Sequence, residues 1–303
     1  MFYVRILGSS SAMPLHGRHH SAQWVYYNGA QFLIDCGEGT QHQAFRFGHK
    51  LHKLQAIFLS HLHADHVAGL GGLLTTLHMQ GHQKGLYIWG PVGVRYFIEQ
   101  QLQGTLSALR YPLFIGEILL RSEMVTLWET SQLVVRAFPL RHGLPTVGYL
   151  FQEKRDSFRL NPDLMSSLGL SSEDILHLRS QGFICLQGRV YTLQDLSLPS
   201  HPMRSYAYCS DTLYFPEIVD FVSGVTVLYH EATFLTEHQE RARQTFHSTA
   251  REAALIAQAA GVRRLYIGHF STRYRNLTPL LLEARSVFPE TYLAEEGQTY
   301  SIE

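Results

Sequence analysis

His61-Leu62-His63-Ala64-Asp65-His66 gathers three imidazoles and one carboxylate within six residues. The segment follows an apolar run, Gln55–Leu59, that is typical of a buried strand, and it precedes a helical pattern over Val67–Met79. Nitrogen and oxygen ligands of this kind suit Zn²⁺. Burying four such groups at one turn is costly without a cation. The segment therefore predicts a metal site where a strand gives way to a helix.

Three more polar residues follow apolar strand patterns further along the chain: His142, Asp211 and His269. The carboxyl ends of strands are where α/β folds usually place their sites. Taken with the first cluster, these residues are expected to be ligands too. Asp211 is the natural bridge, because a carboxylate can serve two cations.

The rest of the chain alternates strand and helix patterns with occasional hairpins, which indicates stacked mixed sheets covered by helices. We therefore expect an α/β fold, a four-layer αββα sandwich forming a single domain over residues 1–303. The expected strands are Phe2–Leu7, Gln23–Tyr27, Gln31–Asp35, Gln55–Leu59, Leu86–Trp89, Leu133–Phe138, Val147–Phe151, Tyr206–Cys209, Val225–Tyr229 and Leu265–Gly268. The expected helices are Glu38–Phe47, Val67–Met79, Val92–Gln103, Leu213–Val222 and Ala250–Ala260.

The pattern loosens over residues 153–204, which we interpret as an inserted arm rather than a separate core. Asn161-Pro162 and Ser171 are typical helix starts, and Gly182–Leu196 is typical of a hairpin. The arm carries six basic and six acidic residues and is therefore neutral.

His247 lies just before a predicted helix start, because Thr249 and Glu252 form a T-x-x-E capping box. A helix N-terminus favours a nearby phosphate. Glu231, placed on a loop after a strand, could accept a hydrogen bond from His247, which would hold the ring and keep it protonated.

The composition is that of an ordinary globular protein, with 45% hydrophobic and 17% charged residues in 303. No apolar run is long enough to span a membrane, and the start of the chain lacks a signal peptide, so a cytoplasmic protein is expected. Cys36, Cys185 and Cys209 have no CxxC spacing and predict no disulfide framework. The formal charge of zero is weak evidence against nucleic-acid binding, although 18 histidines are available for metal ligation or RNA stacking.

With these motifs, the chain resembles the metallo-β-lactamase superfamily and, within it, the ribonuclease Z (tRNase Z) family. The HxHxDH cluster alone indicates the superfamily, whereas the His-Glu-Ala-Thr and His-Ser-Thr segments are more specific to ribonuclease Z. The resemblance covers nearly the whole length and rests on Leu33–Gln41, Phe58–His66, Tyr229–Phe234, His247–Thr249 and His269–Tyr274.

The resemblance implies two zinc ions per subunit. It assigns His61, His63 and His142 to one zinc, and Asp65, His66 and His269 to the other, with Asp211 between them. Asp35 would orient a ligand loop. His247 would be the general acid, supported by Glu231, and Asp65 would accept the remaining proton. Arg273 and Arg18 are the candidate phosphate contacts.

The implied activity is endonucleolytic removal of the 3′ trailer from precursor tRNA, leaving a 3′-hydroxyl on the tRNA, by a homodimer whose arm grips the substrate. The chain departs from the family pattern at Leu170–Asp174, where short arms carry Gly-Pro, and at Pro14–His19, where the family often has Pro-x-Lys-x-Arg-Asn. Three alternative functions stay open. They are a broad phosphodiesterase acting on small or cyclic substrates, a thioester, lactone or β-lactam hydrolase, and a non-catalytic RNA-binding scaffold.

Overall fold

The computed structural model describes residues 1–103, 108–119, 122–154, 160–198 and 203–303. The chain divides into two compact units. The larger, here called the sandwich unit, comprises Met1–Trp128, Val135–Phe151 and Arg204–Glu303. The smaller, here called the arm unit, comprises Glu129–Val134 and Gln152–Met203.

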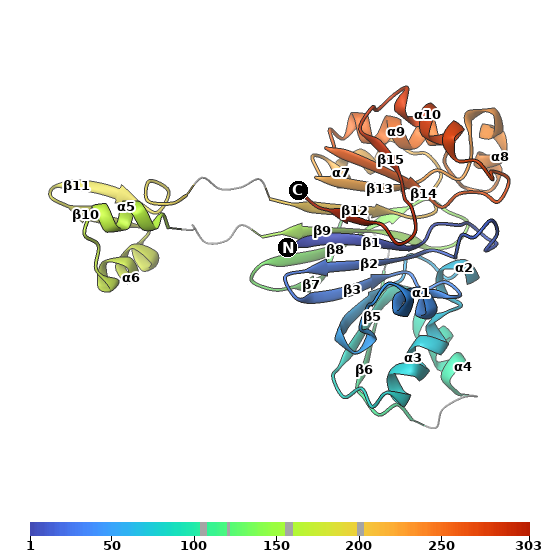
Figure 1. The fold of residues 1–303 in the computed structure, drawn as a ribbon, viewed down its shortest axis with the longest axis horizontal. Coiled ribbons are helices and arrows are strands. Elements are labelled where there is room, and N and C mark those ends of the chain that lie inside the picture. The colour runs from blue at the N-terminus through green and yellow to red at the C-terminus, as the bar shows by residue number, and fades with distance from the viewer. Residues whose placement is uncertain (104–107, 120–121, 155–159, 199–202) are drawn as a thin grey trace. The chain divides into compact units, whose positions relative to one another are not determined.

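Two seven-stranded sheets form the centre of the sandwich unit and lie face to face (Figure 1). The first has the order β16-β1-β2-β3-β4-β5-β6, and the second β15-β14-β13-β12-β9-β8-β7. The first sheet's strands are β1 (Phe2–Gly8), β2 (Ala22–Tyr27), β3 (Ala30–Ile34), β4 (Leu54–Phe58), β5 (Leu86–Pro91), β6 (Leu113–Ile118) and β16 (Thr299–Ser301). The second sheet's strands are β7 (Val125–Glu129), β8 (Leu133–Leu140), β9 (Thr146–Glu153), β12 (Ser205–Cys209), β13 (Val227–Glu231), β14 (Arg264–Gly268) and β15 (Thr291–Leu293).

Helices cover the outer face of each sheet, which gives the four layers expected from the sequence (Figure 1). The first sheet carries α1 (Thr40–Arg46), α3 (Leu70–Met79) and α4 (Val94–Gln103), and the second carries α7 (Ile218–Val222), α9 (Ala250–Ala259) and α10 (Thr278–Arg285). Shorter elements are α2 (Ala64–Val67), α8 (Gln239–Gln244) and the 3₁₀ turns Leu51–Lys53 and Thr236–His238. On each side of the sandwich, the helices and the sheet beneath them enclose a hydrophobic core.

Aromatic rings fill the space between the two sheets. Phe32 and Phe58, from the first sheet, both contact Phe151 from the second, with ring centroids 5.7 and 5.4 Å apart. Leu33 and Ile57, their neighbours along the same strands, belong to the outer core beneath the helices. Both faces of the central strands are therefore buried, which explains their continuous apolar sequences.

The arm unit has a small core of its own, so the expectation that residues 153–204 form an arm without a separate core was wrong. The unit contains α5 (Pro162–Ser167), α6 (Ser172–Gln181) and a hairpin of β10 (Phe183–Leu186) with β11 (Arg189–Thr192). The helix starts predicted at Asn161 and Ser171 are present: Asn161 caps α5, and Ser171 forms a capping box with Asp174 at the start of α6. The buried residues of this core are Leu160, Leu178, Ile184 and Leu196.

Two helix predictions were wrong in their bounds. The helix expected over Val67–Met79 is interrupted after Val67, because Gly69 packs against Gly37 so closely that a Cβ on Gly69 would lie 2.2 Å from the Gly37 carbonyl oxygen. The helix expected over Leu213–Val222 begins only at Ile218. Pro216 disfavours helical geometry at the residue before it. Within the described residues, no helix is long and apolar enough to cross a membrane.

Candidate active site

The predicted ligands converge although they come from both sheets. His61 to His66 follow β4 and include the start of α2, whereas His142, Asp211 and His269 follow β8, β12 and β14. Strands β3 and β4 are parallel, as are β12, β13 and β14. The carboxyl ends of these strands therefore meet along one edge of the sandwich, which is the edge that α/β folds use for sites.

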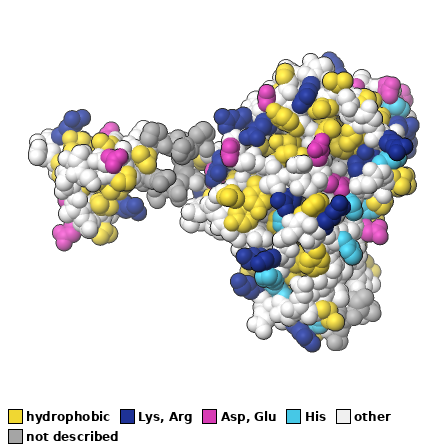
Figure 2. Space-filling model, viewed as in Figure 1, with side chains coloured by type: hydrophobic (Ala, Val, Ile, Leu, Met, Phe, Trp, Pro, Cys, Tyr) yellow, Lys and Arg dark blue, Asp and Glu magenta, His cyan; other side chains and the backbone are white. Residues whose placement is uncertain are grey.

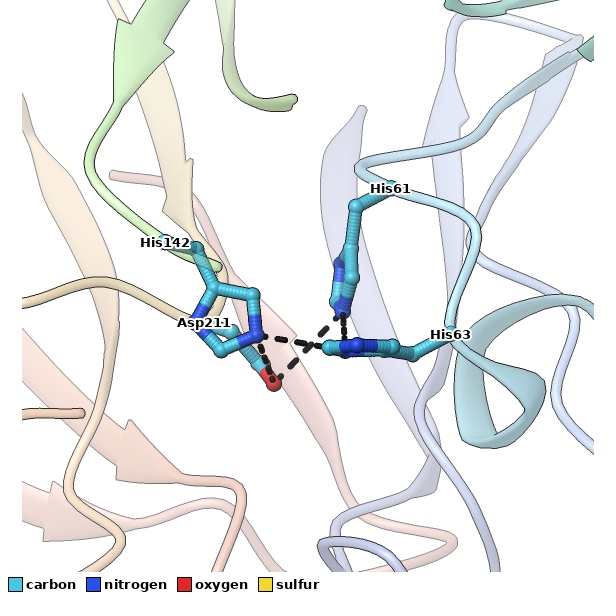
Figure 3. A group of neighbouring side chains, drawn as sticks. All are labelled: His61, His63, His142 and Asp211. Atoms are coloured by element: carbon cyan, nitrogen blue, oxygen red, sulfur yellow. Dashed lines mark hydrogen bonds and ion pairs between the residues drawn. The ribbon is translucent and has the colours of Figure 1, made fainter. Parts of the chain in front are cut away.

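The first group comprises His61, His63, His142 and Asp211, whose side chains point toward one another (Figure 3). His63 Nδ1 lies 3.0 Å from His61 Nε2 and 3.2 Å from His142 Nε2. Asp211 Oδ2 lies 3.7 Å from His61 Nε2 and 3.9 Å from His142 Nε2. These four atoms thus surround one position from several sides.

The second group comprises Asp65, His66, Asp211 and His269. Asp211 Oδ1 lies 3.3 Å from His66 Nε2 and 3.2 Å from His269 Nε2. Asp65 Oδ2 lies 3.5 and 3.4 Å from the same two nitrogens. Asp211 therefore turns one carboxylate oxygen toward each group, which is the arrangement a bridging ligand needs.

Hydrogen bonds on the far side of the rings set their tautomers. His61 Nδ1 lies 3.0 Å from Ser60 Oγ, His66 Nδ1 lies 2.8 Å from Asp35 Oδ2, and His142 Nδ1 lies 2.9 Å from the Phe246 carbonyl oxygen. Each Nδ1 donates to its partner and leaves Nε2 as a bare lone pair.

Lone pairs and carboxylate oxygens thus face one another at short range in a buried site, and they repel unless a cation lies between them. The donor set of imidazole and carboxylate fits Zn²⁺ and neighbouring divalent metals. The residues present therefore suit a pair of divalent cations.

Asp35 anchors the turn that carries the first ligands. Its carboxylate is fully buried and accepts from the Ser60 amide at 2.7 Å, the Ser60 hydroxyl at 2.9 Å and the Tyr208 hydroxyl at 2.7 Å, besides the His66 ring. Asp35 also has a φ of 56°, in the left-handed region that costs a non-glycine residue free energy. The surrounding bonds hold this conformation and with it the orientation of His66.

His247 lies beside both groups. Its ring centroid is 5.2 Å from that of His142 and 5.4 Å from that of His269. His247 Nδ1 donates to Glu231 Oε1 at 2.8 Å. Burial alone would lower the pKa of His247, but the Glu231 carboxylate outweighs burial and raises this pKa to about 9. The Glu231 carboxylate therefore favours the protonated form of this ring.

The capping box predicted at Thr249 is present. Thr249 is the N-cap of α9, its side chain accepts from the Glu252 amide, and Glu252 bonds back to the Thr249 amide. Glu231, in contrast, was wrongly placed on a loop. It is the last residue of β13 and pairs with Gly268 of β14, so the strand itself fixes the carboxylate beneath His247.

The two candidate phosphate contacts differ in their surroundings. Arg18 Nη2 donates to the Tyr274 carbonyl oxygen at 2.9 Å, while Arg18 Nε is buried without a hydrogen-bond partner among the described residues. Arg273 is exposed.

Sequence reasoning missed three residues that contact the site: Tyr208, Phe246 and Thr233. Tyr208 and Phe246 bond to Asp35 and His142 from distant parts of the chain, and no local pattern identifies them. Thr233 lies inside the His-Glu-Ala-Thr segment, so the motif could have drawn attention to it.

Comparisons with known proteins extend over the whole chain. The family model described as Anti-Pycsar protein Apyc1 matches residues 2–142. The chain is 41% identical to ribonuclease Z of Porphyromonas gingivalis over 300 residues, which cover 97% of each protein. Human tRNase Z, short form, aligns over 99% of each chain with a TM-score of 0.74 and 28% identity. The metallo-β-lactamase fold protein YhfI from Bacillus subtilis has a TM-score of 0.69 at 18% identity, which supports the fold alone.

Proposed function

The chain belongs to the ribonuclease Z family, and on that premise we propose that it cuts precursor tRNA after the discriminator nucleotide, leaving a 3′-hydroxyl on the tRNA and a 5′-phosphate on the trailer. The family is metal-dependent and acts on tRNA 3′ ends. The observation that carries the proposal for this chain is the His247–Glu231 pair beside the two ligand groups. That pair supplies a proton donor, which hydrolysis of an RNA phosphodiester requires for its leaving oxygen.

Two zinc ions per subunit are the proposed cofactors. His61, His63 and His142 would hold one and Asp65, His66 and His269 the other, with Asp211 shared. When bound, the cations supply Lewis acidity that stabilises charge on the phosphate and acidifies the attacking water.

Asp65 and His247 would handle the two protons of the reaction. Asp65 Oδ2 is held by the Ala12 amide at 2.9 Å, which aims the carboxylate at the ligand groups and lets it accept the proton of the water. His247, kept cationic by Glu231, would give its proton to the departing 3′-oxygen of the discriminator nucleotide. The start of α9, two residues later, would favour the phosphate nearby.

The arm, residues 153–204, is the proposed exosite for the tRNA body. It has its own small core, and its exposed side chains include Leu176, Phe183 and Val190. With six basic and six acidic residues in the arm, its contacts would depend less on charge than a basic clamp does. Basic and acidic side chains are also interspersed on the face drawn in Figure 2. Arg18 and Arg273 are the proposed phosphate contacts in the sandwich unit. We further propose that the enzyme is a cytoplasmic homodimer.

The test is to incubate the metal-loaded protein with precursor tRNA labelled at each end and to map the cut. Cleavage after the discriminator, with 3′-hydroxyl and 5′-phosphate ends, is expected. His247→Ala should retain its metal and slow single-turnover cleavage by ~10²–10⁴-fold. Bis-p-nitrophenyl phosphate is the parallel substrate. Turnover of this ester without site-specific tRNA cleavage would overturn the proposal in favour of a broad phosphodiesterase.

A further inference from the structure

We propose that Thr233 is a positioning residue whose single hydroxyl joins the Glu231–His247 pair to His269 and so fixes the ring of His269 for the second ligand group. This inference rests on the proposed metal-dependent function. Thr233 follows β13, is 3% exposed, and belongs to neither ligand group.

The hydroxyl of Thr233 lies at the centre of a buried network. Thr233 Oγ1 is 2.6 Å from Glu231 Oε2 and 2.9 Å from His269 Nδ1. It is also 3.0 Å from the His269 carbonyl oxygen and 3.4 Å from His247 Nδ1. One atom thus contacts a candidate ligand and both members of the proton-donor pair.

Counting hydrogens determines the direction of these bonds. A hydroxyl has one proton to donate and two lone pairs that accept. The proton goes to Glu231 Oε2, because this contact is the shortest and its acceptor is a carboxylate. The hydroxyl oxygen then accepts the Nδ1 proton of His269. With its proton on Nδ1, His269 presents a bare Nε2 to Asp211 Oδ1 at 3.2 Å, as a metal ligand must.

The two carboxylate oxygens of Glu231 bond to different side chains, Oε1 to His247 and Oε2 to Thr233. Oε1 accepts from His247 Nδ1 at 2.8 Å and from the Thr212 amide at 2.9 Å. Oε2 accepts from the hydroxyl of Thr233 at 2.6 Å and from its amide at 3.1 Å. The carboxylate that charges His247 is therefore the same one that orients Thr233, and through Thr233 it orients His269.

The backbone places Thr233 opposite His269. Glu231 pairs with Gly268 in the parallel ladder of β13 and β14, and the Ala232 amide donates to the Gly268 carbonyl oxygen at 2.8 Å. His269 itself has a φ of 57°, a left-handed conformation that persists only when its surroundings enforce it. The hydroxyl of Thr233 supplies part of that enforcement by accepting the Nδ1 proton of the His269 ring.

Thr233→Val keeps the shape of the side chain and removes the hydroxyl, whereas Thr233→Ser keeps the hydroxyl. Thr291→Val is the matched control, because Thr291 is also buried and its hydroxyl donates to the Phe288 carbonyl oxygen, its one hydrogen-bond partner in the described part of the chain. Zinc affinity would be measured for each protein by competition with a chromophoric chelator. Thermal unfolding would report on the integrity of the fold.

In Thr233→Val, one zinc equivalent should bind ~10–100-fold more weakly, as expected when a bond behind a ligand is lost, while the other keeps its affinity. Thr233→Ser should restore the wild-type value, and Thr291→Val should not change it. Wild-type affinity for both equivalents in Thr233→Val, or an equal loss in Thr291→Val, would overturn the inference. If the valine variant does not fold, Thr233→Ala replaces it with the same expectation.

This readout needs no RNA and separates the inference from the proposed function. If the wild-type protein leaves precursor tRNA uncut but the affinity shift appears, only the proposed substrate fails. If tRNA is cut and the affinities do not change, only the role of Thr233 fails.

Discussion

Replacing Glu231 by glutamine isolates the charge that keeps His247 protonated. Glutamine has nearly the same shape, so the buried site keeps its packing while the carboxylate charge disappears. Burial opposes protonation of His247, and the carboxylate overcomes it to raise the pKa from 6.5 to about 9. At about 1.4 kcal/mol per pKa unit, this rise corresponds to ~3.5 kcal/mol in favour of the protonated ring. The side chain of His247 is only 15% exposed, so solvent screens this interaction weakly.

The rate effect follows from the protonated fraction. At pH 7.5 a group with a pKa of 9 is ~97% protonated. Without the carboxylate, burial holds the pKa of His247 below 6.5, where at most ~9% of the rings are protonated, so the protonated fraction falls by ~10-fold or more. The variant also replaces the charge-assisted hydrogen bond that orients the ring by a weaker neutral one, so single-turnover cleavage should fall by ~10²–10³-fold in total. Because the raised pKa keeps the donor protonated below about 9, activity that depends on it is lost as pH rises. In Glu231→Gln this loss should begin at lower pH.

The assay is single-turnover cleavage by metal-loaded protein across pH 6–10, with metal content measured in parallel. The deficit of Glu231→Gln should shrink toward acidic pH, where a less basic imidazole regains its proton. Glu252→Gln is the control, since Glu252 is a buried glutamate that accepts hydrogen bonds from Thr249 and Gln239, and within the described residues none from His247. It should keep the shape of the wild-type profile. A wild-type profile in Glu231→Gln, with metal retained, would refute the role of this charge.

Three further outcomes are expected. Asp211→Ala should lose bound metal together with activity, because its two oxygens face different groups, and about two retained zinc equivalents would contradict a bridge. Replacing residues 155–202 by a short linker should lower kcat/KM for precursor tRNA by ~10²-fold or more and leave hydrolysis of small phosphodiesters intact, whereas equal losses on both substrates would argue against an exosite. Burial lowers the pKa of His49, stacked on Trp24, to about 4, so its neutral form stabilises the fold fully above pH 6.5 and progressively less as pH falls toward 4. In urea titrations, His49→Phe should therefore lose less unfolding free energy than wild type between pH 6.5 and 4.5. Equal losses in the two proteins would contradict this prediction.

The features predicted correctly from the sequence are those encoded locally. The helix start at Ser171 and the capping box at Thr249 depend on neighbouring residues and were recognisable without any tertiary information. The apolar runs of the central strands reflect burial on both faces, so β4, β12 and β14 were found close to their true bounds.

Long-range contacts explain what the sequence did not reveal. The position of Glu231 in β13 depends on its pairing with Gly268, and the break after Val67 depends on Gly69 approaching Gly37. The contact between Thr233 and His269 likewise follows from strand register, which a sequence pattern does not display. Strands β6 and β15 also escaped prediction, since β15 has only three residues and the sequence of β6 lacks sustained alternation.

The converging side chains run from His61 to His269 and come from both sheets. Protein synthesis proceeds from the N-terminus, so four of these residues emerge early and His269 emerges close to the end. A chain that stops before His269 lacks a residue of the second group, however well its first sheet has folded. Premature termination should therefore release a fragment without a complete active site. A nascent chain likewise has no complete active site with which to cleave the RNA around it.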